Sequence, residues 1–359
     1  MTVAEVTATE VGFVSLTVLV VERLTTDSVA VEFAQPLGAP LVFAPGQHLT
    51  LRRMMDGVDV RRTYSLCSSA GSGRLRIAVK RITGGALSTW LVDELQPGQR
   101  IEALPPAGSF GPRLDGAATH RYVLFAAGSG ITPIASIVSS VLETESASSL
   151  TLVCGNRTTA EVMLLEELAD LKDRYPSRFQ LLHVLSGEQQ SAALLSGRID
   201  GDRVRLLLAT LLPPDEVDSW FVCGPFGMVT GVRDALLGAG IAPRLIHVEL
   251  FYAEPVAVPT RTVDGNATAS TVHAVLHGRS TTVQVEPAGA SVLDALLAVR
   301  ADAPYACRGG VCGTCRARVT EGAVEMDVNY ALEPDELEAG IVLTCQAHPS
   351  TPVVRLEYV

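Results

Sequence analysis

Short alternating strands fill the first third of the chain. Hydrophobic and polar residues alternate over 15–21 and again over 74–80, and turn residues separate such stretches from about Val11 to Asp115. Alternation with a period of two buries one face of a strand, and short strands at regular spacing are typical of antiparallel barrels. The pattern therefore predicts an antiparallel β-barrel over residues 1–115.

Strands and helices alternate in the middle of the chain. Apolar runs predict buried strands, and helical spacing predicts the segments between them. The predicted strands are Tyr122–Ala127, Leu150–Cys154, Phe179–Leu185, Trp220–Cys223 and Leu245–Leu250, and the predicted helices are Pro133–Leu142, Glu161–Arg174, Arg203–Leu211 and Phe226–Leu237. This order is typical of a doubly wound parallel sheet, so we expect an α/β domain over residues 116–253.

The last part of the chain predicts a linker and a third domain. Residues 254–269 have no periodicity and are rich in Pro, Thr and Ala, which indicates an interdomain linker. Strands over Val272–His277 and Thr281–Val285 and a helix over Val292–Val299 follow, and then a cysteine-rich loop. We therefore expect a third domain over residues 270–359.

Composition narrows the class of protein. A length of 359 residues predicts two or three domains. A net charge of -11 and a pI near 5.2 argue against nucleic acid or an anionic membrane as a partner. The sequence has no run of 18 apolar residues, and its start lacks the features of a signal peptide, so we expect a cytoplasmic protein. Cys67, Cys154 and Cys223 are expected to be reduced thiols.

Four cysteines form the strongest chemical motif. Cys307, Cys312, Cys315 and Cys345 have the spacing C-x4-C-x2-C…C, which is the ligand pattern of plant-type 2Fe–2S clusters. Glycines at 309, 310 and 313 let backbone N–H groups approach the cluster without a β-carbon in the way. A structural zinc site is the alternative, but zinc motifs usually pair short C-x2-C units. The sequence therefore predicts an iron–sulfur centre.

Two segments of the first domain are candidate phosphate or ring sites. Arg62-Thr63-Tyr64-Ser65 offers a guanidinium for a diphosphate and a tyrosine for a heteroaromatic ring, although an exposed arginine beside a barrel tyrosine is the simpler interpretation of four residues alone. In Gly84-Gly85-Ala86-Leu87-Ser88, backbone N–H groups, a hydroxyl and a helix start could hold phosphate oxygens. That segment is equally compatible with a glycine turn capped by serine.

Two loops of the α/β domain are candidate nucleotide sites. Gly128-Ser129-Gly130-Ile131-Thr132-Pro133 joins the first strand to the first helix, where free N–H groups attract a pyrophosphate. Cys223-Gly224-Pro225-Phe226-Gly227-Met228 follows a later strand at the same carboxyl edge. Ligands of open α/β sheets bind at that edge, so both loops predict one crevice. Taken alone, Cys223 is more simply a small buried hydrophobic residue.

In this order, the motifs at 62–65, 128–133 and 223–228 resemble the flavin and nicotinamide motifs of the ferredoxin–NADP reductase family. The cysteine loop makes the chain similar to members that carry their own ferredoxin domain. Within that group, residues 249–252 and 326–346 most resemble the reductase subunits of phenylacetyl-CoA epoxidases. The resemblance covers essentially the whole chain. It implies a flavin-binding β-barrel, an NAD(P)-binding α/β domain and an α+β ferredoxin domain of β-grasp type.

The resemblance also implies the cofactors and the roles of residues. FAD, NADPH or NADH, and a 2Fe–2S cluster are expected, with Thr132 near the nicotinamide and flavin rings and Cys223 beside the nicotinamide carbon. The implied catalytic residues are Tyr64, Ser65, Thr132 and Cys223. The implied cofactor-binding residues are Arg62, Thr63, Tyr64, Ser65, Val79, Gly85, Ala86, Leu87, Ser88, Gly128, Ser129, Gly130, Thr132, Pro133, Arg157, Cys223, Gly224, Pro225 and Met228. The implied metal ligands are the four cysteines.

The nicotinamide preference stays open at this stage. Many NADPH-using relatives have Ser-Arg after the third α/β strand, where the arginine meets the 2′-phosphate. Here Ser186 is followed by Gly187. Arg157 could supply the missing cation, so the sequence favours NADPH without excluding NADH.

These parts together imply an electron relay from NAD(P)H through FAD and the cluster to a terminal oxygenase. The expected partner is a multisubunit di-iron oxygenase, phenylacetyl-CoA 1,2-epoxidase of phenylacetate degradation. Reductases of steroid hydroxylases, or of aromatic-ring dioxygenases with FMN, are alternatives, as is an electron carrier without NAD(P)H oxidation. The acidic run Glu333, Asp335, Glu336 and Glu338 is a candidate docking surface, although such runs are more often solvated. His247 and His348 are expected to be structural or solvated.

Overall fold

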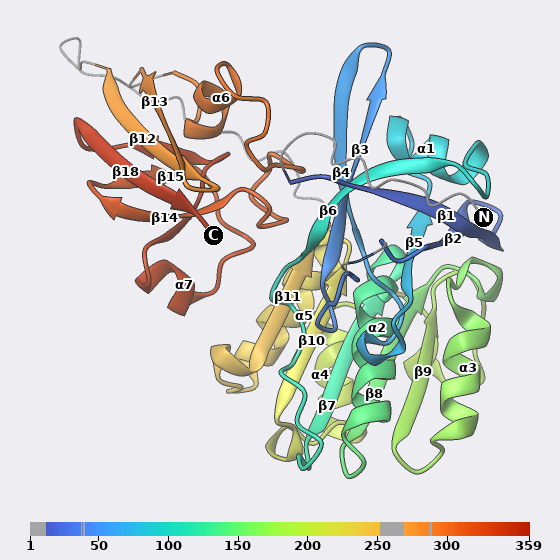
Figure 1. The fold of residues 1–359 in the computed structure, drawn as a ribbon. Coiled ribbons are helices and arrows are strands. Elements are labelled where there is room, and N and C mark those ends of the chain that lie inside the picture. Colours follow the sequence, from blue (N-terminus) through green and yellow to red (C-terminus); the bar gives the residue numbers. More distant parts are fainter. Residues whose placement is uncertain (1–11, 37, 39, 252–268, 287–288) are drawn as a thin grey trace. The chain divides into compact units, whose positions relative to one another are not determined.

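The computed structural model describes residues 12–359 except 37, 39, 252–268 and 287–288. The described chain divides into two compact units, one over Phe13–Phe251 and one over the residues from 269 onward (Figure 1). All but the last residue of the predicted linker, 254–269, lies outside the described residues. No helix among the described segments combines the length and the apolar composition needed to cross a bilayer.

The first sheet of the first unit is antiparallel, as the alternating pattern predicts. Its strand order is β4-β3-β6-β1-β2-β5, and a bridge between Leu66 and Ile77 joins the end of β4 to β5. Helix α1 follows β5, and alternate residues of the strands fill an apolar core. The elements are β1 (Val14–Thr25), β2 (Ser28–Phe33), β3 (His48–Met55), β4 (Val58–Ser65), β5 (Leu75–Lys80), α1 (Ala86–Asp93) and β6 (Arg100–Ala107).

The second sheet of this unit is parallel, in the order β11-β10-β7-β8-β9. The chain leaves the central strand β7 in one direction through β8 and β9, and it returns on the other side through β10 and β11. The boundary between β7 and β10 is therefore the switch point at which such sheets bind ligands. The elements are β7 (Arg121–Ala127), α2 (Ile131–Thr144), β8 (Ser149–Asn156), α3 (Leu165–Arg174), β9 (Phe179–Leu185), α4 (Gly201–Thr210), β10 (Ser219–Gly224), α5 (Phe226–Gly238) and β11 (Ile246–Leu250).

One helix begins later than the sequence predicts. The predicted helix Glu161–Arg174 starts at Leu165, and only the short 3-10 turn Thr159–Glu161 precedes it. Leu164 has a φ of 57°, which is left-handed and interrupts a helix. Val162, Met163 and Leu164 are all buried. Burial of this apolar segment in the core outweighs its helical spacing, so the prediction was wrong at this end.

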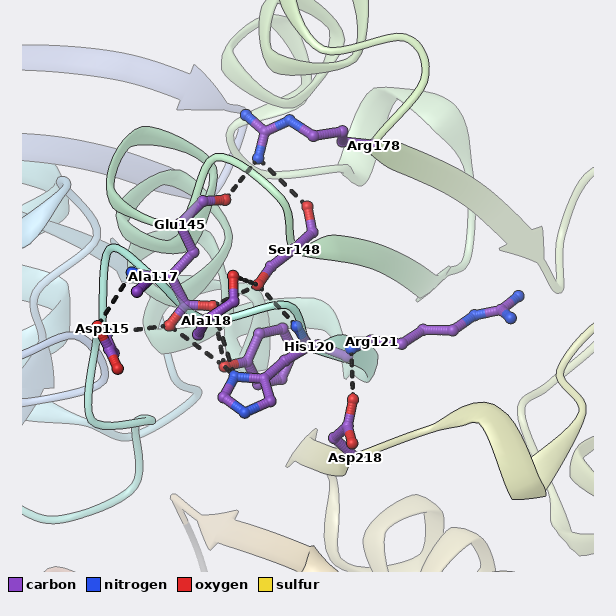
Figure 2. A network of polar contacts seen from close by, with 10 residues as sticks. Asp115, Ala117, Ala118, His120, Arg121, Glu145, Ser148, Arg178 and Asp218 are labelled. Atoms are coloured by element: carbon purple, nitrogen blue, oxygen red, sulfur yellow. Dashed lines mark hydrogen bonds and ion pairs between the residues drawn. The ribbon is translucent and has the colours of Figure 1, made fainter.

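A network of polar contacts lies at the amino ends of the parallel strands, where β7 and β8 begin, on the side of the sheet opposite the ligand-binding carboxyl ends (Figure 2). The fully buried carboxylate of Glu145 accepts hydrogen bonds from the Tyr122 hydroxyl at 3.1 Å and from the Ser148 hydroxyl at 2.7 Å. The Arg178 guanidinium donates to the backbone oxygen of Glu145 at 2.8 Å. Burial raises the pKa of Tyr122, so this residue remains a donor. The network anchors the edge that faces away from the switch point.

Side chains connect the barrel to the parallel sheet within the first unit. The Ser136 hydroxyl on α2 donates to the backbone oxygen of Ser68 at 2.8 Å. Arg76 on β5 forms an ion pair with Glu167 on α3 at 2.7 Å. These contacts bring the strand ends of the barrel near the first helix of the α/β domain.

The second unit has a mixed five-stranded sheet in the order β13-β12-β18-β14-β16 and a two-stranded sheet of β15 and β17. Helix α6 packs on the core of this sheet, which includes Cys315 and Cys345. The elements are β12 (Ser270–Leu276), β13 (Arg279–Val285), α6 (Val292–Leu297), β14 (Arg316–Glu321), β15 (Val324–Met326), α7 (Pro334–Glu338), β16 (Ile341–Leu343), β17 (Ala347–Pro349) and β18 (Val353–Tyr358).

Candidate functional site

The candidate flavin motif lies at the end of β4. Successive side chains of a strand point to opposite faces, so Arg62 and Tyr64 share one face and Ser65 lies on the other. Arg62 is exposed, and its guanidinium donates to the backbone oxygen of Arg61 at 2.7 Å. Burial raises the pKa of Tyr64, which therefore stays protonated. The motif offers a cation and an aromatic ring on one side of the strand and a hydroxyl on the other.

The side chain of Ser88 forms hydrogen bonds within the turn that precedes α1. The buried Ser88 hydroxyl accepts from the backbone N–H of Ile82 at 3.1 Å and donates to the Gly85 oxygen at 3.1 Å. Ser88 thus closes the turn, which is the simpler of the two interpretations of this segment. Helix α1 begins at Ala86, and the N–H groups of its first turn have no partners within the helix. These N–H groups remain candidate donors to a phosphate.

The two glycine loops of the α/β domain meet at the switch point. Gly128 has a φ of 55°, and Gly130 lies directly against the backbone of Cys223. Thr132 is buried, and its hydroxyl donates to the Ser129 oxygen at 3.0 Å. Close packing brings the loops 128–133 and 223–228 together, with Thr132 on one loop and Cys223 on the other.

Glu249 joins this group, although the sequence motifs gave it no role in the site. The parallel register pairs Cys223 on β10 with Glu249 on β11. Burial raises the pKa of Glu249 to about 8, and a hydrogen bond with Ser65 opposes this shift. Its Oε2 is buried and has no hydrogen-bond partner among the described residues. A buried, unpartnered carboxyl oxygen at the meeting point of Ser65 and Cys223 fits a site that binds a polar cofactor.

Burial and the nearby Glu249 carboxyl raise the pKa of the Cys223 thiol, so Cys223 is a neutral thiol. Glu249 lies at the end of the strand next to β10. Its position at the carboxyl edge was the signal in the sequence that could have identified it.

A pocket of about 660 Å³ lies at the carboxyl edge of the parallel sheet. Four of the predicted residues line it, namely Gly128, Arg157, Pro225 and Met228. Gly224 packs against Met228, since a β-carbon there would be 2.8 Å from the Met228 methyl. The lining also includes Lys80, Ser186 and Arg198, of which Arg198 and Lys80 lie outside the motifs predicted to bind the nicotinamide nucleotide.

The four cysteines come together as two pairs. Hydrogen bonds link the thiols of Cys307 and Cys312 and those of Cys315 and Cys345. The bond from Cys312 lowers the pKa of Cys307, and the bond from Cys315 lowers the pKa of Cys345. Among the described residues, no three His, Cys, Asp or Glu side chains surround a point for a single metal ion. Two thiol pairs match the need of a two-iron cluster for two cysteine ligands on each iron.

Gly310 allows the cysteine loop to pack closely against Val328. It has a φ of 74°, and an added β-carbon would lie 3.1 Å from both the Val328 oxygen and its Cγ2 atom. The Gly309 N–H donates to the sulfur of Cys307 at 3.3 Å. Backbone donors that face the sulfurs are the environment that an iron–sulfur cluster needs, so the loop fits the predicted group.

The acidic run and the two histidines have structural contacts. Glu333 and Glu336 form a capping box at the start of α7, and Glu336 also pairs with Arg316 at 3.2 Å. His348 contacts Asp327 at 2.9 Å, and the His247 ring stacks on Phe221 at 4.8 Å. Part of the acidic run therefore stabilises its own helix. None of the seven cysteines, all of which lie among the described residues, forms a disulfide bond.

Comparison with known proteins agrees with this geometry. Three family models match: an oxidoreductase FAD-binding domain over residues 15–111, an oxidoreductase NAD-binding domain over 124–234 and a 2Fe-2S iron-sulfur cluster binding domain over 274–350.

Two relatives match nearly end to end. One of the subunits of 1,2-phenylacetyl-CoA epoxidase from Escherichia coli is 43% identical, and the match covers 96% of this chain and 98% of the relative. The ferredoxin reductase component of 3-ketosteroid-9-alpha-monooxygenase from Rhodococcus rhodochrous is 37% identical over 96% and 97% of the two chains.

Among solved structures, phthalate dioxygenase reductase is 25% identical, with a TM-score of 0.60 over 97% of this chain and 98% of its own. These matches confirm the predicted fold class, cofactor classes and reductase activity. The chain therefore belongs to the ferredoxin–NADP reductase family, among the oxygenase reductases that join an FAD-binding, an NAD-binding and a 2Fe–2S domain in one polypeptide.

Proposed function

We propose that this reductase passes electrons from NADPH through FAD and a 2Fe–2S cluster to phenylacetyl-CoA 1,2-epoxidase. The observation that carries this proposal is the 43% identity to the relative from that epoxidase over almost the whole of both chains. The expected acceptor is a multisubunit di-iron oxygenase. A ketosteroid monooxygenase is the second candidate, supported by the 37% identity to its reductase component.

The proposed domains are 1–115 for FAD, 116–253 for NAD(P) and 270–359 for the cluster, with 254–269 as linker. Arg62, Tyr64, Ser65 and the first turn of α1 are proposed to hold FAD. The loops 128–133 and 223–228 hold the nicotinamide nucleotide, and Cys307, Cys312, Cys315 and Cys345 bind iron. The two thiol pairs and the packing of the loops after β7 and β10 support this assignment.

When bound, FAD supplies the chemistry that turns a hydride into single electrons. The residues of the chain provide position and environment. Thr132 and Cys223 lie at the switch point, where they can hold the nicotinamide against the flavin. Burial raises the pKa of Glu249 to about 8, so near neutral pH the carboxyl group is mostly protonated; in that form it can donate a hydrogen bond and carries no negative charge.

Two arginines support NADPH as the donor. Arg157 and Arg198 both line the pocket and are exposed, and the hydroxyl of Ser186 lies in the same lining. Lys80 is also there, but its amino group lies 3.4 Å from Asp27. Two guanidinium groups and a hydroxyl suit a 2′-phosphate, which carries more negative charge than the hydroxyl of NADH. Arg198 thus complements Arg157 in place of an arginine at position 187.

Anaerobic titration of the purified protein with NADPH, and separately with NADH, tests the relay. We expect the absorbance of both flavin and cluster to bleach, and NADPH to react faster. In Cys312→Ser, oxidation of NADPH by ferricyanide should persist while cluster reduction is lost. Bleaching of neither chromophore in protein that contains both would contradict the relay, and FMN on extraction would contradict FAD.

Reconstitution tests the acceptor. The reductase is mixed with the purified oxygenase components of the epoxidase, phenylacetyl-CoA, NADPH and oxygen, and product formation is measured. A parallel reaction contains the ketosteroid oxygenase and its steroid. Turnover with the first and not with the second supports the proposal, and the reverse result favours the second candidate.

A further inference from the structure

A glutamine connects the distant fourth cysteine to the cysteine loop. Gln346 directly follows Cys345 and is only 7% exposed. Its side-chain Nε2 lies 2.8 Å from the backbone oxygen of Arg308, 3.1 Å from the oxygen of Cys345 and 3.4 Å from the Cys345 sulfur. One amide therefore bonds to both segments that surround the proposed cluster.

The surroundings determine which way this amide points. The oxygens of Arg308 and Cys345 are acceptors only, so the NH2 group and not the amide oxygen must face them. Its two protons can serve the Arg308 oxygen and, as a shared bond, the oxygen and sulfur of Cys345. The Gln346 Cγ lies 3.3 Å from the position of a β-carbon on Gly310, so the stem is packed against the loop as well. The donor is held in place.

We propose that the side chain of Gln346 raises the reduction potential of the 2Fe–2S cluster by donating an N–H bond to the sulfur of Cys345. This inference rests on the proposed function, in which Cys345 is an iron ligand. Reduction of the cluster takes one electron from the flavin, adds no proton and increases the negative charge on the ligand sulfurs. A fixed N–H donor stabilises that charge, so it favours the reduced state.

Gln346 is a positioning residue, since it acts through Cys345. Gly309 also donates to a cysteine sulfur, but with its backbone N–H, which every substitution except proline retains. The side chain of Gln346 can be changed while the backbone bond from Asp327 to the Gln346 oxygen, 3.0 Å long, is kept. Gln346→Met preserves length and shape and removes the donor.

The test is a mediated redox titration of the full-length protein, followed by EPR of the reduced cluster. In Gln346→Met we expect reduction of the cluster to become about tenfold less favourable, which is about 59 mV toward negative potential. The flavin potentials should not change. Gln284→Met is the matched control, because Gln284 is the only other glutamine from residue 270 onward and lies exposed on β13.

A second measurement covers the case in which Gln346→Met assembles no cluster. Wild-type protein labelled with ¹⁵N-glutamine should show a weak ¹⁵N coupling to the reduced cluster in pulsed EPR, and Gln284→Met should retain it. An assembled Gln346→Met cluster with unchanged potential overturns the inference, as does the absence of the coupling. Wild-type protein without any 2Fe–2S signal would instead overturn the proposed function.

Discussion

A β-carbon on Gly130 would lie 2.3 Å from the backbone oxygen of Cys223, which is too close for a non-bonded carbon and oxygen. The loop after β7 thus approaches the loop after β10 to a distance that only glycine allows. Gly130→Ala should push the loops apart and misplace Thr132 and Cys223. We expect kcat/KM for NADPH with ferricyanide to fall about 100-fold, because a shift of about 1 Å has that effect.

Gly238→Ala is the control for Gly130→Ala, because nothing lies within 4 Å of an added β-carbon at this position on α5. Alanine is a better helix former than glycine, so the melting temperature should hold or rise slightly. Wild-type activity in Gly130→Ala would show that the contact does not position the site.

The raised pKa of Glu249 predicts a pH dependence of stability. A carboxyl group whose pKa rises from 4.5 in the unfolded chain to about 8 in the folded chain binds more protons when folded between these values. The stability that neutral Glu249 contributes is fully present below about pH 4.5 and is lost as pH rises through 8. We therefore expect the melting temperature of Glu249→Gln to rise relative to the wild type between pH 5 and pH 8.5.

Glu166→Gln on α3 is the control for Glu249→Gln, because Glu166 is exposed. Its melting temperature should follow that of the wild type at every pH. If the difference in melting temperature between the wild type and Glu249→Gln is the same from pH 5 to pH 8.5, the carboxyl group of Glu249 does not titrate in this range.

The arginines of the pocket predict a change in cofactor preference. A charge-assisted hydrogen bond to phosphate contributes about 1.5–3 kcal/mol, so Arg157→Ala and Arg198→Ala should each lower kcat/KM for NADPH about 10–100-fold. The value for NADH should change little. Arg244→Ala is the control, since Arg244 is exposed and does not line the pocket. An equal loss with both nucleotides would refute the assignment to the 2′-phosphate.

Two adjacent glycines of the cysteine loop should respond differently to alanine. Gly310→Ala forces a positive φ on alanine and brings its β-carbon 3.1 Å from Val328, whereas the β-carbon of Gly309→Ala has only the Cys307 oxygen within 4 Å, at 3.9 Å. We expect Gly310→Ala to lose most of its iron and sulfide while its flavin content stays normal. Gly309→Ala should keep all three. Equal iron content in the two variants would contradict the tight fit at Gly310.

The network at the other edge of the parallel sheet predicts a loss of stability without a loss of chemistry. In Glu145→Gln, an amide NH2 replaces one acceptor oxygen among the donors Tyr122 and Ser148, so about 1–3 kcal/mol of stability should be lost. Glu216→Gln, at an exposed ion pair with Arg121, should lose less than about 1 kcal/mol. Thermal unfolding of both variants and of the wild type measures the two losses of stability. If Glu145→Gln melted at the same temperature as the wild type, the network would not contribute to stability.

Local patterns along the chain were enough to predict the antiparallel barrel, the parallel α/β sheet and the cysteine motif, whereas the β-grasp type of the third domain came from the family resemblance. A period of two, apolar runs between helices, and the spacing of the first three cysteines all depend on residues that are near one another in the sequence, whereas Cys345 is distant from them. The elements Phe179–Leu185 and Phe226–Gly238 lie where the pattern predicts them, because buried periodic segments have one favourable conformation. Leu164 is the exception, since tertiary burial set its backbone.

The meeting of distant residues, in contrast, depends on how the elements pack in three dimensions. Glu249 reaches Cys223 through the register of two parallel strands, and it reaches Ser65 because the barrel packs on the α/β domain. Arg198 enters the pocket from the loop before α4, and the Gln346 amide crosses to Arg308. No local pattern encodes such contacts, because long-range packing brings the groups together and burial then sets their protonation and hydrogen bonds.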